Sequence, residues 1–246
     1  MDGPANPSPR AVVAVCGRFV AITDADGLAR FLVVDKRDVD HLAPSYNVAP
    51  THEVHAAVEQ AGRRTLVALR WGLLPTWLDD PTTGPGLINA RAETAAVKPA
   101  FRDAFARRRC LIPADGFYEW RAGPARTKVP YFIRAPDDRP LALAGLWTTS
   151  RPRDPWRPVL RTCAILTTVA TRPVSALHDR APVMLPAAAW DEWLDPDHPD
   201  PRALSRLLLP APDDALVMHA VSQQVNSVGH NHPGLIEPVP EQLRLG

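Results

Sequence analysis

Cysteine and long apolar runs are scarce in this 246-residue chain, and each scarcity excludes a class of protein. Three cysteines are an odd number, which makes no disulfide framework and favours a reducing, cytoplasmic compartment. No apolar run approaches the about 18 residues that a membrane-spanning helix needs, so we expect no membrane partner. Residues 1–15 lack both the basic start and the long apolar core of a signal peptide.

An excess of one charge sign is also absent overall, since the formal net charge is +1, but charge is unevenly distributed. Residues 89–128 hold nine Lys or Arg against four Asp or Glu, whereas residues 190–215 hold seven acids against two bases. A local basic surplus in a neutral chain is typical of a face that binds a polyanion. A solvated surface without a partner is the alternative interpretation.

Many short runs of β-forming residues are separated by turn residues, with few helical patterns between them. This arrangement, without steady strand–helix alternation, predicts an α+β fold. We expect a single domain over residues 16–240, with a mostly antiparallel, barrel-like β core flanked by short helices. Residues 1–15, rich in Pro, Asn and Ser, are predicted to form a disordered leader. Predicted strands are 16–22, 65–75, 109–121, 129–135, 141–147, 162–170 and 215–222, and predicted helices are 25–34, 101–109, 186–194 and 201–209.

Glu119 lies between two aromatic residues in the run GFYEW, residues 116–120. A carboxyl group in apolar surroundings has a raised pKa, which suits a general acid or base. The alternative is a carboxylate on a strand that faces water or pairs with Arg121.

His178 lies in the loop ALHDRAP, residues 176–182, beside a carboxylate and a guanidinium. An imidazole there can move protons or stabilise negative charge, and a satisfied loop histidine is the alternative. Asn89 and Arg91 are two residues apart, so on an extended segment they point to the same face. In that position the amide can orient a substrate while the guanidinium holds a phosphate.

No cofactor and no metal ion are predicted. His230 and His232 lack neighbouring Cys or carboxylate residues, so a polar loop is the better interpretation. The chain also has no phosphate-cradling glycine loop and no nucleophile elbow of a serine hydrolase. Cys16 with His178 as its base would make a thiol hydrolase, which is a rival hypothesis.

Nine short motifs occur in a fixed order. They are CGRF (16–19), YNVAPT (46–51), RWGLLP (70–75), INARAET (88–94), FRDAFARRRCLIPADGFYEW (101–120), AGLW (144–147), TCAILTT (162–168), HDRAPVML (178–185) and VNS (225–227). Each motif is weak alone, but nine in order are highly specific. Together they resemble the SRAP family, the SOS response-associated peptidase-like proteins that shield abasic sites in DNA, and the resemblance extends from Cys16 to about Pro238.

The resemblance implies a covalent crosslink to an abasic site in single-stranded DNA through a cysteine at the mature N-terminus, which is Cys16 here. It therefore implies abasic single-stranded DNA as the partner, and we expect a monomer. Trp71 is predicted to stack on bases if exposed, or to be a core residue if not. A noncovalent single-strand binder is a further alternative. Active-site positions are matched by Asn89, Glu119 and His178, phosphate-gripping positions by Arg91 and Arg180, and positions near the DNA channel by Arg18, Asn47, Pro50 and Trp71.

The implied chemistry needs both the nitrogen and the sulfur of Cys16. A free α-amine condenses with the aldehyde of the opened abasic sugar to an imine, and the thiolate then adds to the same carbon to close a thiazolidine. Ring closure is intramolecular, and an α-amine with a pKa of about 8 is partly neutral near pH 7. We expect Glu119 to move protons, His178 to donate to the sugar ring oxygen, and Asn89 to orient the amine or the sugar.

Val15 is where the chain departs from the family pattern, which has Met directly before this cysteine. An amide nitrogen cannot form an imine, so a chain that keeps residues 1–15 cannot do this chemistry. Translation starting at Val15 from a GUG codon, followed by removal of the initiator Met, would resolve the conflict. Cleavage of the leader, by the protein itself or by another protease, would also resolve it. The third explanation is that this member has lost crosslinking.

Overall fold

The computed structural model describes residues 16–39, 41–77, 85–122, 127–150, 156, 159–198 and 200–240. The predicted leader 1–15, including Val15, lies outside these residues. Among the helices of the described ranges, none is long and apolar enough to cross a membrane.

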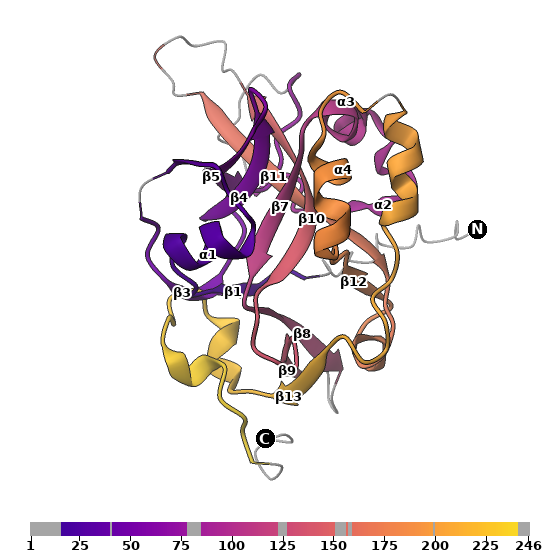
Figure 1. Ribbon diagram of the computed structural model, residues 1–246. Helices are drawn as coiled ribbons and strands as arrows, with labels where there is room; N and C mark the ends of the chain where they lie inside the picture. Colours follow the sequence, from indigo (N-terminus) through magenta and orange to yellow (C-terminus); the bar gives the residue numbers. More distant parts are fainter. Residues whose placement is uncertain are drawn as a thin grey trace, which may run out of the picture.

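Five strands form a ring at the centre of the molecule (Figure 1). Neighbours pair antiparallel in the order β11–β10–β7–β4–β5. The ring is closed by a short parallel pairing of β5 with β11, in which only Arg70 and Trp71 find partners, at Thr162 and Cys163. The predicted α+β class with a mostly antiparallel core is therefore confirmed. The strands are β4 (Glu53–Gln60), β5 (Arg63–Trp71), β7 (Arg109–Ala114), β10 (Leu141–Ser150) and β11 (Leu160–Val169).

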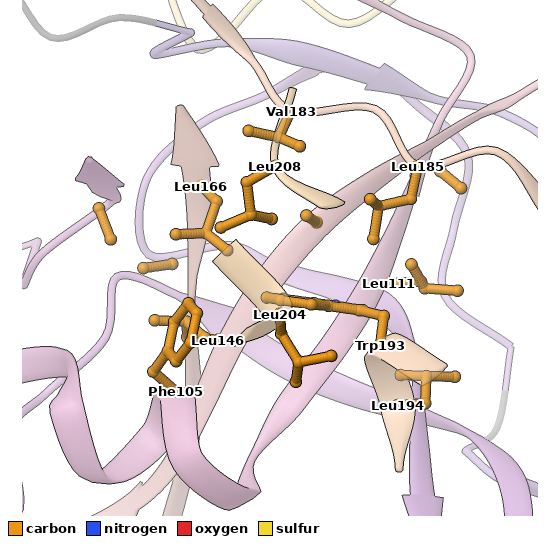
Figure 2. Packing of buried hydrophobic residues seen from close by; sticks show 14 of the residues in the cluster. Phe105, Leu111, Leu146, Leu166, Val183, Leu185, Trp193, Leu194, Leu204 and Leu208 are labelled. Atoms are coloured by element: carbon orange, nitrogen blue, oxygen red, sulfur yellow. The ribbon is translucent and has the colours of Figure 1, made fainter. Parts of the chain in front are cut away.

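Side chains alternate between two faces of the ring, and both faces are buried. On β7, Cys110 and Ile112 join a cluster with Trp71 that we call the inner core. Leu111, between them, joins a cluster that we call the outer core, which also contains Phe105 and Trp193 from two helices (Figure 2). Burial on both faces explains why β7 is apolar throughout rather than alternating in polarity.

Helices α2 (Ala92–Ala95), α3 (Pro99–Arg107) and α4 (Trp190–Leu194) lie together on one side of the ring (Figure 1). Trp193 and Phe105 meet edge to face with ring centroids 5.8 Å apart. Helix α1 (Ala25–Phe31) lies on the other side.

Arg109, the first residue of β7, forms hydrogen bonds to the C-terminal ends of both α3 and α4. Its side chain is buried, and the guanidinium donates to the carbonyl oxygens of Phe105 at 2.7 Å and of Ala106 at the end of α3. It also donates to the carbonyls of Trp193 and Asp195 at the end of α4. A cation at helix C-termini is favourable, and these four contacts satisfy a charge that has lost its water.

A second, antiparallel sheet lies across one end of the ring, in the order β13–β9–β8–β1–β3. Phe19 of β1 pairs with Phe117 of β8, and both contribute to the inner core. This sheet therefore brings the start of the domain against the barrel interior. Its strands are β1 (Phe19–Ala21), β3 (Ser45–Val48), β8 (Gly116–Ala122), β9 (Lys128–Arg134) and β13 (Val217–Ala220).

The remaining elements are short. Strand β2 pairs with β5, and β6 and β12 pair with β11. They are β2 (Lys36–Asp38), β6 (Asn89–Arg91), β12 (Arg180–Pro182) and the 3₁₀ helices η2 (Val174–Ala176), η3 (Ala187–Ala189), η4 (Pro201–Leu207), η5 (Gln223–Asn226) and η6 (Pro233–Leu235).

Several predicted boundaries were wrong for local reasons. The strand predicted over 65–75 ends at Trp71, because Gly72 has a φ of +124° and a Cβ there would lie 1.7 Å from the Pro85 carbonyl oxygen. The run 109–121 is two strands, separated at Asp115. The helix predicted over 201–209 is the 3₁₀ helix η4.

Candidate functional site

Cys16 lies just before β1 with a fully buried side chain. Its backbone adopts a φ of 48°, in the left-handed region that non-glycine residues rarely occupy. The backbone nitrogen donates a hydrogen bond of 2.6 Å to Oε1 of Glu119. The structure thus fixes the nitrogen of Cys16, as well as its sulfur, within the site.

Glu119 is held there by the alternation of β8. Phe117 points into the inner core, and Glu119, two residues on, points the same way and is only 2% exposed. Burial raises the pKa of Glu119 to about 7, against the opposing effects of the N–H groups of Cys16 and Trp120 and the charge of Lys128. The water-facing alternative is wrong, and Arg121 lies over the ring of Tyr131 instead.

The thiol of Cys16 is protonated in this environment. Burial, and secondarily the charge of Glu119, raise the pKa of the thiol well above its ordinary value. A thiol of this kind becomes a nucleophile only when a base takes its proton during the reaction. Glu119 is the acid–base group whose contact with Cys16 the structure records.

Three distant segments contribute to the same inner core as Cys16. Ala181 is a buried member of this cluster, and Ile88 and Leu177 pack against it. These three residues adjoin Asn89, His178 and Arg180 in the sequence, so the predicted site segments border the inner core.

Strand pairing explains this convergence. Strand β11 pairs with β6, placing Asn89 beside Ile165, and with β12, placing Arg180 beside Val169. Both strands are three residues long, too short for a sequence pattern of their own, and it is their pairing with β11 that holds them in place.

His178 is largely buried and has two partners at one nitrogen. The backbone N–H of Arg180 donates to Nδ1 at 3.0 Å, and the carboxylate of Asp179 lies 2.7 Å from the same atom. Asp179 is 86% exposed, so its attraction is screened by water. A neutral ring that accepts from Arg180 carries its proton on Nε2 and is a donor there.

The two predicted phosphate-gripping arginines have different surroundings. Arg91 is exposed on β6. Arg180 is only 15% exposed and binds both carboxylate oxygens of Glu93, at 2.7 and 2.9 Å. The geometry therefore favours Arg91 as the arginine that faces an incoming anion.

Arg18 and Asn47, predicted near a DNA channel, hold the C-terminal part of the chain instead. Arg18 donates to Oδ1 of Asn47 and to the carbonyl oxygen of Val225, each at 2.8 Å. Asn47 is buried, and its amide donates to the carbonyl oxygens of Ser227 and His230, each at 3.0 Å. A buried amide used in this way is not available to DNA.

Trp71 is a core residue, so the expectation that it stacks on bases is wrong. It is fully buried, donates from Nε1 to the carbonyl of Ile88 at 3.0 Å, and packs edge to face on Phe19. Pro50 lies in the half-buried turn after β3. Trp77, two residues beyond Pro75, is 58% exposed.

The loop histidines confirm the polar-loop interpretation. His230 Nδ1 lies 2.8 Å from the carbonyl oxygen of Gln224, and His232 Nε2 lies 3.0 Å from the side-chain oxygen of the same residue. Within the part of the chain that the structure describes, no three or more His, Cys, Asp or Glu residues are grouped to hold a metal ion.

Comparison with known proteins gives consistent matches. Residues 15–228 match the family model described as SOS response associated peptidase (SRAP). The chain is 39% identical over 227 residues to abasic site processing protein YoqW of Bacillus subtilis, covering 91% of this chain and 99% of that protein. It is 31% identical to abasic site processing protein YedK of Escherichia coli, covering 92% of this chain and 100% of that one.

Among solved structures, a protein from Bacteroides thetaiotaomicron matches with a TM-score of 0.81, covering 92% of this chain and 100% of that one. At 23% identity, this likeness concerns the fold alone.

Proposed function

Since the chain belongs to the SOS response associated peptidase (SRAP) family, we propose that it is a DNA-damage protein that shields abasic sites in single-stranded DNA. In this proposal Cys16 forms a covalent thiazolidine with the opened abasic sugar. Relatives named as abasic site processing proteins support the substrate class. The observation that carries the chemistry is the 2.6 Å hydrogen bond between the backbone nitrogen of Cys16 and the Glu119 carboxyl group.

The reaction joins an aldehyde and an aminothiol with loss of one water. The amine of Cys16 adds to the aldehyde carbon, and Glu119 carries a proton from the nitrogen to the resulting hydroxyl, which leaves as water. The thiol then loses its proton to Glu119, the sulfur adds to the imine carbon, and Glu119 passes that proton to the imine nitrogen, which becomes the N–H of the thiazolidine. With a pKa of about 7, Glu119 is present in both protonation states near neutral pH, as two-way proton transfer requires.

Other residues act before this step. An abasic sugar is mostly closed, and a donor at its ring oxygen helps to open it; the Nε2–H of neutral His178 is suited to that role. Asn89 orients the amine or the sugar. Arg91, exposed on β6, contacts a phosphate, and exposed Trp77 offers a face for base stacking.

The working form in this proposal begins at Cys16, because an amide nitrogen cannot form the imine. Translation from Val15 with removal of the initiator Met is one route. Self-cleavage is another, which would give the peptidase name a meaning. In that route the thiol attacks the preceding carbonyl carbon, Glu119 protonates the nitrogen as the peptide bond breaks, and water hydrolyses the thioester.

An adduct assay tests the proposal. A form beginning at Cys16, the full 246-residue chain, and a Cys16→Ser form with the same start are each mixed with single-stranded DNA containing one abasic site. Products are separated on a denaturing gel, and intact mass shows which N-terminus each protein carries. We expect a heat-stable adduct from the Cys16 form, at least about 100-fold less from a chain that keeps its leader, and none from Cys16→Ser.

The same assay separates the rival functions. Equal adduct formation by a chain whose mass still includes residues 1–15 would contradict the thiazolidine. Binding without any heat-stable adduct in all three forms would favour a noncovalent binder. Peptide hydrolysis that persists with the leader in place would favour the thiol hydrolase.

A further inference from the structure

The ion pair between Glu93 and Arg180 joins two parts of the site. Glu93 lies in the first turn of α2, directly after β6. Its Oε1 accepts from Nη1 of Arg180 at 2.7 Å, and its Oε2 accepts from Nη2 at 2.9 Å. Two parallel bonds between planar groups fix orientation as well as distance.

This pair spans a strand. Thr167 of β11 pairs with Arg91 of β6 and also with Pro182 of β12, so β6 and β12 lie on opposite sides of β11. The side chain of Arg180 crosses β11 to reach Glu93, and on the way Nη2 donates to the carbonyl oxygen of Thr167. The segment with Asn89 and Arg91 is thereby tied to the segment with His178.

The backbone of Arg180 continues this connection to His178. Its N–H donates to Nδ1 at 3.0 Å, where it competes with the carboxylate of Asp179. A neutral ring that accepts this N–H carries its proton on Nε2. If Arg180 moves, Nδ1 retains only Asp179, which favours a proton on Nδ1 instead.

Glu93 is charged in this arrangement. The hydrogen bond from Arg180 lowers the pKa of Glu93 most, and burial opposes it as the second-largest effect. The backbone N–H of Glu93 and the charges of Arg180 and Arg91 lower this pKa further. The carboxylate therefore balances the charge of Arg180 before any DNA arrives.

We propose that Glu93 is a positioning residue, which holds Arg180 across β11 and so keeps His178 in the form that donates from Nε2. The inference rests on the proposed function for its catalytic readout, whereas its geometric part is independent of that function. It predicts that Glu93 acts on the rate of the chemistry and not on DNA affinity.

A double-mutant cycle tests this role. Glu93→Ala, Arg180→Ala and the double variant are made in the form beginning at Cys16. Adduct rates are measured at saturating abasic single-stranded DNA, and affinity is measured with a tetrahydrofuran site, which has no aldehyde. We expect Glu93→Ala to slow the adduct step about 10-fold without weakening binding, and the double variant to be no slower than Arg180→Ala alone.

Two further variants sharpen the test. Glu93→Gln retains one acceptor oxygen and should recover part of the rate. Asp103→Ala removes an exposed carboxylate that pairs with Arg102, and should react at the wild-type rate. The proposal would be overturned if the effects of Glu93→Ala and Arg180→Ala on the adduct rate were additive. It would also be overturned if Glu93→Gln lost affinity and rate equally and had a lowered melting temperature.

A spectroscopic measurement separates this inference from the proposed function. The imidazole ¹⁵N signals of His178 are recorded without DNA. We expect Glu93→Ala to shift the ring toward the Nδ1–H form, and unchanged signals would overturn the positioning role. Absence of any adduct from the wild-type Cys16 form would instead refute the proposed function, while this spectrum would still decide the role of Glu93.

Discussion

Glu119 and Cys16 form a buried pair in which a carboxyl group has lost nearly all of its water. The ionised carboxylate gains only partial compensation from the N–H groups of Cys16 and Trp120 and from Lys128, because the net pKa remains raised. A fold gains no stability by burying such a group. Strongly shifted carboxyl groups in contact with a nucleophile are typical of functional sites.

Glu119 therefore makes stability depend on pH. Between its ordinary pKa of 4.5 and its folded pKa of about 7, the folded protein holds a proton that the unfolded chain has released. Stability must then fall as pH rises through this window, by about 3 kcal/mol in total at about 1.4 kcal/mol per pKa unit. Glu119→Gln should remove that fall.

Urea unfolding from pH 4.5 to pH 8 measures this effect in the wild type and in Glu119→Gln. Glu53→Gln, an exposed carboxyl group on β4, serves as the matched control and should keep the wild-type slope. Identical slopes in the wild type and in Glu119→Gln would show that Glu119 does not bind the extra proton.

Among the elements, α3 and α4 share the guanidinium of Arg109. It donates hydrogen bonds to four carbonyl oxygens at the C-terminal ends of these helices. A shape-matched apolar side chain would leave those carbonyls without these donors. Each unsatisfied buried acceptor costs about 1–3 kcal/mol. One residue at the start of β7 thus joins two helices to the outer core.

Arg109→Met should accordingly destabilise the protein by about 3–5 kcal/mol, because four carbonyls lose a donor at about 1–3 kcal/mol each while the apolar side chain no longer buries a charge. Arg107→Met is the matched control, because Arg107 is exposed on the last turn of α3 and pairs with Asp197 at 3.5 Å. Denaturant unfolding measures both. Equal, small effects would mean that the helix ends are satisfied without Arg109.

The elements also show what sequence reasoning can reach. Glu119 was predictable, because its aromatic neighbours are adjacent in sequence and the alternation of β8 turns it inward. Strands β6 and β12 have no periodicity of their own, since three residues are too few and their partner β11 is distant in the chain. The role of Arg18 was hidden for the same reason, because its partner Val225 lies 207 residues away.

For the whole molecule, Asn47 connects the first and last parts of the domain. It holds a segment that includes η5 against β3, and Trp120 of β8 donates to Asn226 of the same segment at 2.8 Å. In Figure 1 this segment lies beside the second sheet, away from α2, α3 and α4. We therefore expect that this segment can loosen while the barrel stays folded.

Asn47→Ala should loosen the C-terminal segment without unfolding the ring, because it removes donors to the carbonyls of Val225, Ser227 and His230. Hydrogen exchange should become about 10-fold faster in residues 223–231 and stay unchanged in β7 and β10. Gln60→Ala, on the barrel strand β4, should leave residues 223–231 as protected as in the wild type. Uniformly faster exchange across the whole protein would contradict this separation.

The ring is closed by the pairing of Arg70 with Thr162, so it can close only after Thr162 has been synthesised. At about 5–20 residues per second, a ribosome needs roughly 10–30 seconds between making Cys16 and making His178. During that interval the inner core around the thiol is incomplete, because Leu177 and Ala181 have not yet been added. The site is therefore incomplete while it is being synthesised, before the ring closes.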